Sequence, residues 1–233
     1  MGRRFSLVLT IFALLSVSLS ADGGSVSGKI VFDDKIPRLR PLRIESDPAC
    51  AAKHDGRVYP DFLILGEDNA LANVLIQVRN PPPGNYQAPE EAIVIDQVGC
   101  VYTPRVVAVM TGQELLFRNS DGILHNVHGL PKANREFNIG MPPTVAESSQ
   151  RLVEPEPAFP VRCDVHPWME AYVAVLSHPF FSISGEDGRY EIDDLPPGTY
   201  ELAAWHEKLG IHTTTVTVEE GEATADFTLR VPK

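Results

Sequence analysis

The stretch Gly188-Arg-Tyr-Glu-Ile-Asp-Asp-Leu-Pro-Pro-Gly-Thr-Tyr-Glu-Leu202 contains the pattern that decides the fold class. Apolar side chains alternate with polar ones on both sides of a Pro-Pro-Gly turn: Tyr190 and Ile192 stand before it, Tyr200 and Leu202 after it. An alternation with a period of two residues is typical of a half-buried strand, and proline and glycine end regular structure. We therefore expect a hairpin-like pair of strands on either side of this turn.

Strand patterns continue through most of the 233 residues, a length that suggests one large or two small domains. Short apolar or alternating runs, separated by Gly, Pro, Asn and Asp, occur at residues 26–32, 72–78, 93–95, 106–110, 114–118 and 172–176. A helical period is present only weakly, at residues 47–53. The sequence therefore predicts an all-β protein, with a sandwich or a barrel as the natural architecture.

The start of the chain has the pattern of a secretion signal. Arg3 and Arg4 form a basic start, an apolar run follows, and the small residues Ser18 and Ser20 fit a cleavage site. We expect residues 1–20 to be a signal peptide, so that the mature protein is exported and periplasmic or extracellular. An uncleaved anchor is the alternative, and the general secretory and twin-arginine routes both stay open. No later stretch holds 18 consecutive apolar residues, and we expect no membrane span.

The net charge of −11 limits the partners of the protein. Nucleic acids and anionic membranes attract clusters of Lys and Arg. The densest basic stretch, residues 38–43, is short and has the composition of a solvated loop. We therefore expect no nucleic-acid partner.

A candidate metal-binding loop lies at Cys163-Asp-Val-His166-Pro-Trp-Met169, which places a thiolate, an imidazole and a thioether within seven residues. A second imidazole stands upstream, at His125 in the sequence Leu-His-Asn-Val-His. Two His, one Cys and a weak axial Met form the ligand set of a blue-copper electron-transfer site. Pro167 should shorten and stiffen the loop, so that its side chains fold onto one ion.

The segment at residues 90–178 resembles the cupredoxin family, and its amicyanin branch in particular, which has a Cys-x-x-His-x-x-Met loop and an upstream His-Asn-Val-His. The resemblance implies a Greek-key β-sandwich with one type 1 copper ion and the ligands His125, Cys163, His166 and Met169. It also implies one-electron transfer between a donor and an acceptor redox protein. Four complete protein ligands leave no open coordination position, and we do not expect a copper enzyme.

Residues next to the expected ligands are candidates for tuning the site. Asp164 stands where many cupredoxins have Ser or Thr, and its carboxylate can accept the amide hydrogen bond of Asn126. Trp168 is either a docking patch or electron path near the copper, or a core filler. His128 lies three residues after His125, which puts it on the opposite face of an extended strand. We expect His128 to be a surface or structural residue.

Residues 188–202, an opening strand at residues 26–31 and a strand at residues 71–78 together resemble the carboxypeptidase regulatory-like domain, a transthyretin-like or carbohydrate-binding-like β-sandwich. Because these pieces lie near both ends of the chain, the resemblance implies a nested arrangement. Residues 24–79 and 179–233 would build a second small sandwich around the inserted copper domain.

The other two of the three cysteines, Cys50 and Cys100, are expected to form a disulfide in an exported protein. A second metal or haem site that uses Cys50 and His54 is the weaker alternative. His206 and His212 are expected to be partly buried polar residues, with a contribution to a second site as the alternative.

The favoured function is one-electron transfer by a type 1 copper centre. The alternative is a cell-envelope module that binds carbohydrate or protein, in which the copper domain is structural or vestigial. Aromatic platforms for a glycan would come from Trp205, Tyr200 and Tyr190, although the alternation places the two tyrosines in the core.

Overall fold

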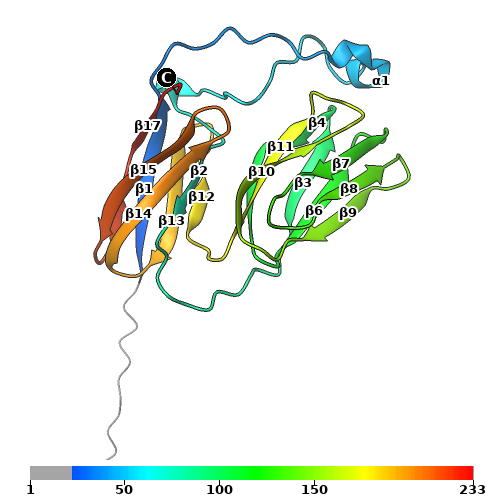
Figure 1. Ribbon diagram of the computed structural model, residues 1–233. Coiled ribbons are helices and arrows are strands. Elements are labelled where there is room, and N and C mark those ends of the chain that lie inside the picture. Colours follow the sequence, from blue (N-terminus) through cyan, green and yellow to red (C-terminus); the bar gives the residue numbers. More distant parts are fainter. Residues whose placement is uncertain (1–22, 233) are drawn as a thin grey trace, which may run out of the picture.

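The computed structural model describes residues 23–232, whose strands are arranged as two β-sandwiches lying side by side (Figure 1). The prediction of an all-β protein is confirmed, since helices in the described residues are short. The expected signal peptide, residues 1–20, lies outside the described residues. Within the described part, no helix is long and apolar enough to cross a membrane.

The first sandwich is built from both ends of the chain. One sheet has the order β13 (Arg189–Leu195), β1 (Gly24–Phe32), β16 (Glu222–Thr224), with β17 (Phe227–Leu229) also paired to β1. The other has the order β12 (Phe181–Ile183), β2 (Leu75–Val78), β14 (Gly198–His206), β15 (Gly210–Val218). The inward side chains of the two sheets form one core, which includes Val26, Ile76, Ile192 and Leu202.

The strands on either side of the Pro-Pro-Gly turn do not form the expected hairpin. Strand β13 pairs with β1 in one sheet, whereas β14 pairs with β2 and β15 in the other. The turn carries the chain from one sheet to the other, and Tyr190 and Tyr200 reach the shared core from opposite sheets. The hairpin prediction was wrong because alternation identifies the buried face of a strand but not its partner.

The second sandwich lies between β2 and β12 in the chain. Its larger sheet has the order β5 (Val106–Met110), β11 (Glu170–Leu176), β10 (Glu156–Arg162), β7 (His125–Gly129), β8 (Phe137–Met141). Its smaller sheet has the order β4 (Val101–Thr103), β3 (Ile93–Val98), β6 (Glu114–Asn119), β9 (Glu147–Arg151). The core between them includes Ile95, Phe117, Val161 and Val173, and it extends to Cys163 and Met169. The expected metal-binding loop is thus part of the end of this core.

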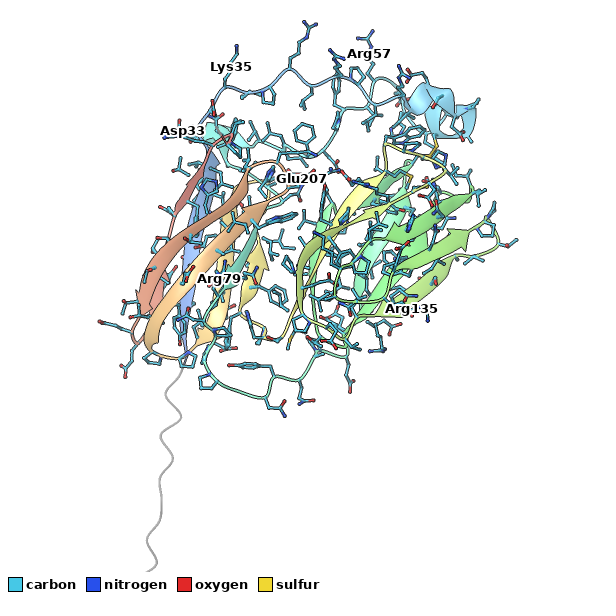
Figure 2. The ribbon with its side chains drawn as sticks, in the orientation of Figure 1. Asp33, Lys35, Arg57, Arg79, Arg135 and Glu207 are labelled. Carbon is cyan, nitrogen blue, oxygen red and sulfur yellow. A yellow bond between two sulfur atoms is a disulfide. The ribbon has the colours of Figure 1, made fainter. Side chains whose placement is uncertain are left out.

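The two sandwiches share a packed boundary. A third apolar cluster lies there, with the buried members Leu75, Val106, Ala108, Ala174 and Leu176. Beside this cluster the side chain of Arg105 is 7% exposed and forms ion pairs with Asp61, Glu170 and Glu207. Figure 2 shows Glu207 where the two sandwiches meet.

The chain between β1 and β2 leaves the first sandwich, passes over one end of the second, and returns (Figure 1). Its short helices are η1 (Ile44–Ser46), α1 (Pro48–Ala51) and η2 (Glu67–Asn69). Asp47 caps α1, because its Oδ1 accepts hydrogen bonds from the backbone amides of Ala49 and Cys50. Ile44 and Cys50 are buried in the core of the second sandwich. Part of the expected range 24–79 therefore packs outside the first sandwich.

Candidate metal centre

Three of the four expected ligands converge at one end of the second sandwich. His125 is the first residue of β7, and Cys163 and His166 lie in the loop between β10 and β11. The Nδ1 atoms of His125 and His166 are 2.9 Å apart, and Cys163 Sγ is 3.7 Å from His166 Nδ1. All three side chains are buried. The residues form a compact group of nitrogen and sulfur donors that suits a soft or borderline metal ion.

The Nε2 atoms of both imidazoles face carboxylates. His125 Nε2 is 2.9 Å from Asp121 Oδ2, and His166 Nε2 is 3.2 Å from Asp47 Oδ2. An ionised carboxylate only accepts hydrogen bonds, so each Nε2 carries a hydrogen and donates it. In a neutral imidazole the lone pair is then on Nδ1, and the two lone pairs face each other. This arrangement needs a cation between the nitrogens, a proton or a metal ion, and it fits a metal centre with carboxylate-supported histidines.

Both carboxylates are ionised at neutral pH. Burial alone would raise the pKa of Asp121, but hydrogen bonds from His125 and from two backbone amides lower this pKa to about 2. The hydrogen bond from His166 lowers the pKa of Asp47, and the backbone amides of α1 lower it further. The two imidazoles are therefore held by fixed negative charges on the side away from Cys163.

The Cys163 thiol is set up to ionise. Burial would raise the pKa of Cys163, but a contact with His125 and hydrogen bonds from backbone amides lower it on balance. One of these amides belongs to His166, whose nitrogen is 3.4 Å from Sγ. Burial would likewise lower the pKa of His125, yet Asp121 and Cys163 raise it above its usual value. The thiolate is the form that binds a metal, so the site favours the binding form of its sulfur.

Met169 closes the ligand loop. Its side chain is 1% exposed, in the same core cluster as Cys163. Met169 N donates to His166 O at 2.9 Å, and Cys163 N donates to Met169 O at 3.3 Å. These bonds fix the loop backbone, and the exposed Pro167 sits at its turn. The expected role of Met169 as axial ligand stays a prediction.

The hydrogen-bond partners of Asp164 extend away from the ligand group. Asn126 Oδ1 accepts from Asp164 N at 2.6 Å, and Asn126 Nδ2 donates to Asp164 Oδ2 at 3.1 Å. The carboxylate also contacts His128 Nδ1 at 3.1 Å, and Glu136 lies 2.9 Å from the other nitrogen of that ring. Both ring nitrogens of His128 thus contact surface carboxylates, and the residue lies outside the donor group. The hydrogen bonds between Asn126 and Asp164 connect β7 to the ligand loop.

Trp168 stands beside the group and packs, partly buried, against the core of the second sandwich. Its ring centroid is 5.1 Å from that of His166, and its Nε1 donates to Cys100 O at 3.0 Å. The side chain is half-buried and lines a surface pocket together with Leu42 and Phe62. The indole therefore connects the interior of the site with the surface.

Cys50 and Cys100 are joined by a disulfide. Both cysteines are buried, and Cys50 Sγ lies 3.5 Å from His166 Nε2. The bridge removes the thiolate that a second metal or haem site at Cys50 would need. His54 instead places its Nε2 2.7 Å from Gly99 O. Among the described residues, two other groups of donor side chains lie close together, one with Cys50 and one with Cys100. Because both sulfurs are in the bridge, neither group offers a thiolate for a second metal site.

The remaining aromatic and histidine candidates lie in the first sandwich. Tyr190 and Tyr200 are buried in its core, and Trp205 is half-buried against Tyr172 at the boundary between the sandwiches. His206 is 1% exposed, and neither it nor His212 joins a metal-ligating group among the described residues. An aromatic platform and a second metal site thus have no support from these residues.

The sequence reasoning missed the two carboxylates, Asp121 and Asp47. Asp121 stands four residues before His125, and this spacing matches no known sequence motif for a carboxylate that supports a histidine ligand. Asp47 comes from the chain between β1 and β2, and its only signal was the expected bridge from Cys50 to Cys100, which brings this segment to the second sandwich.

Comparison with known proteins gives a partial likeness in each sandwich. No curated protein sequence matches the chain. A family model described as polysaccharide lyase family 4, domain II, matches residues 180–226. This match falls within the first sandwich, and it is not the carboxypeptidase regulatory-like domain that the motifs there resemble.

Solved structures that are similar to part of the chain include a copper-containing nitrite reductase, amicyanin and another cupredoxin. A copper-containing nitrite reductase from Thermus scotoductus SA-01 is 18% identical, with 41% of this chain and 25% of that chain covered at a TM-score of 0.34. The oxidized state of an amicyanin mutant is 21% identical, with 43% and 97% covered at 0.33. A purple cupredoxin from Nitrosopumilus maritimus is 20% identical, with 35% and 97% covered at 0.30. The matched part thus spans a quarter of the reductase chain.

Proposed function

We propose that the protein is an exported type 1 copper protein that transfers one electron at a time between a donor and an acceptor protein. The convergence of two imidazole Nδ1 atoms and the Cys163 sulfur, with both Nε2 atoms fixed by carboxylates, carries this proposal. His125, Cys163 and His166 would hold the copper, with Met169 as a weak axial ligand. Bound there, the metal would supply a Cu(I)/Cu(II) couple.

The chain contributes three things to such a centre. The lowered pKa of Cys163 favours the thiolate, and the ligand side chains are buried from solvent. Backbone bonds within the loop and the Asn126–Asp164 contacts hold the ligands in place. A site that is rigid and buried reorganises little when its charge changes by one, which suits electron transfer.

Burial also supports the proposal that the protein is not an enzyme. A copper enzyme needs an open coordination position that its substrate can reach. Here the relative exposure of His125, Cys163 and His166 is 0%, 2% and 2%. The donor side chains are thus buried from solvent, and electron transfer does not need direct contact with the metal.

Export is part of the proposal, and the disulfide supports it. Bridges such as Cys50–Cys100 persist in oxidising compartments and are rare in the cytosol of most organisms. The periplasm or the extracellular space fits both this bridge and the expected signal peptide.

The test is the optical and electron paramagnetic resonance spectrum of the copper-loaded mature protein. We expect an intense thiolate-to-copper charge-transfer band in the visible range, which disappears in Cys163→Ser and His125→Gln. His128→Gln is the matched control, because it removes an imidazole from the same strand outside the donor group, and it should keep the band. A colourless copper-loaded protein, or a band that survives Cys163→Ser, would refute the proposal.

A further inference from the structure

The cap segment, defined as residues 43–54, covers the outer edge of the candidate metal centre. Its helix α1 lies over one end of the second sandwich in Figure 1. From this segment Asp47 Oδ2 and Cys50 Sγ approach His166 Nε2 to 3.2 Å and 3.5 Å. The relative exposure of His166 is therefore only 2%. The edge of the imidazole that points away from Cys163 faces protein rather than solvent.

The cap segment is attached to the second sandwich by contacts that do not involve Asp47. The disulfide from Cys50 to Cys100 is one, and the buried side chain of Ile44 is another. Lys53 Nζ lies 3.1 Å from Asp121 Oδ1 and donates to Asp121 O at 3.0 Å. A change at residue 47 should therefore leave the cap segment in place.

The two oxygens of Asp47 have separate partners. Oδ1 accepts from the amides of Ala49 at 2.8 Å and Cys50 at 3.3 Å, which caps the helix. Oδ2 faces His166 Nε2 alone among the described side chains. Capping of α1 needs only the first oxygen, so the second is available to orient the imidazole.

Resting on the proposed copper function, we infer that Asp47 is a positioning residue of the metal centre. Asp47 accepts a hydrogen bond from Nε2 of His166. This bond keeps the hydrogen on Nε2, so that the lone pair of Nδ1 faces Cys163 before any metal binds. Asp121 does the same for His125, and the cap segment reaches this second carboxylate through Lys53. The cap segment thus supplies the carboxylate behind His166 and contacts the carboxylate behind His125.

Asp47→Asn tests whether residue 47 orients His166 without removing the cap of helix α1. The amide oxygen keeps the helix cap, while the amide nitrogen becomes a donor that faces the Nε2 hydrogen of His166. Two donors cannot share a hydrogen bond, so we expect His166 to move its hydrogen to Nδ1, as a histidine does when its orienting carboxylate becomes an amide. Glu45→Gln, an exposed residue of the same segment, is the control for the lost charge.

The first measurement uses the metal-free protein. Nitrogen-15 NMR at neutral pH distinguishes a protonated from an unprotonated ring nitrogen for each histidine. We expect His166 to carry its hydrogen on Nε2 in the wild type and in Glu45→Gln, and on Nδ1 in Asp47→Asn. The same form of His166 in all three proteins would overturn the inference.

The second measurement is the copper affinity, from competition with a chelator. Loss of an outer partner of a metal-bound histidine weakens metal binding by about 10- to 100-fold, and we expect that loss in Asp47→Asn but not in Glu45→Gln. Equal affinities in the two variants would contradict the inference. A wild type without the charge-transfer band would refute the copper function instead, and the NMR result would still decide whether Asp47 orients His166.

Discussion

Removal of the Cys50–Cys100 bridge should destabilise the protein by about 4 kcal/mol. The bridged residues are 50 apart in the sequence. In the chain-entropy model, a loop of this length removes about 14 cal/mol/K from the unfolded ensemble, which is about 4 kcal/mol at 25 °C. Alanine is the replacement to use, because serine would place two hydroxyl groups in a buried apolar site. The lost sulfur contacts act in the same direction.

Urea unfolding of the metal-free protein measures this effect. With a slope of about 2 kcal/mol per molar urea, the midpoint of the Cys50→Ala/Cys100→Ala protein should fall by about 2 M. Cys163→Ala is the matched control, because it removes a buried sulfur from the same core without opening a bridge. A shift no larger than that of the control would refute the entropic reasoning, and a wild type that binds a thiol reagent at Cys50 would show that no bridge exists.

Two further predictions concern charges away from the metal centre. Arg105→Met leaves the buried Glu207 with Lys208 as its remaining ion-pair partner and should cost about 3 kcal/mol in urea unfolding, and Glu207→Met added to it should recover most of the loss; a cost below about 1 kcal/mol would contradict this. Burial would raise the pKa of Glu156, but the side chain of Asn134 and three backbone amides lower it on balance. Its stabilising effect is therefore complete above the unfolded value of about 4.5 and is lost as the pH falls through the lower folded value, so Glu156→Gln should flatten the fall of the urea midpoint between about pH 5 and 3. An unchanged acid profile in Glu156→Gln would show that another carboxyl group is responsible.

Most of the ligand group could be predicted from the sequence because its members are close together along the chain. Cys163, His166 and Met169 lie in one short loop, and their types alone point to a soft metal. The buried faces of the strands were equally accessible, since a period of two fixes which side chains point inward. Tyr190 and Tyr200 are in the core as their alternation predicts.

Pairing and long-range packing were not accessible, because nothing local encodes them. The Pro-Pro-Gly turn is compatible with a hairpin and with a crossing between sheets, and the choice depends on where β1 and β2 lie. The weak helical period at residues 47–53 does not reveal where residues 42–58 pack. Asp47 contacts His166 across 119 residues, a separation at which no spacing rule applies.

The nested chain makes the two sandwiches interdependent at the metal centre. The chain between β1 and β2 begins and ends at the first sandwich, yet the cap segment in its middle contacts the second sandwich. Residues 90–178 contain every expected ligand but lack Asp47, Cys50 and Lys53, which act on the outer sides of both imidazoles. A shift of one sandwich relative to the other would pull on that segment, and the apolar boundary and the Arg105 ion pairs resist such a shift. The first sandwich therefore supplies no ligand but holds both ends of the chain that carries the cap segment, while contacts with the second sandwich fix that segment over the metal centre.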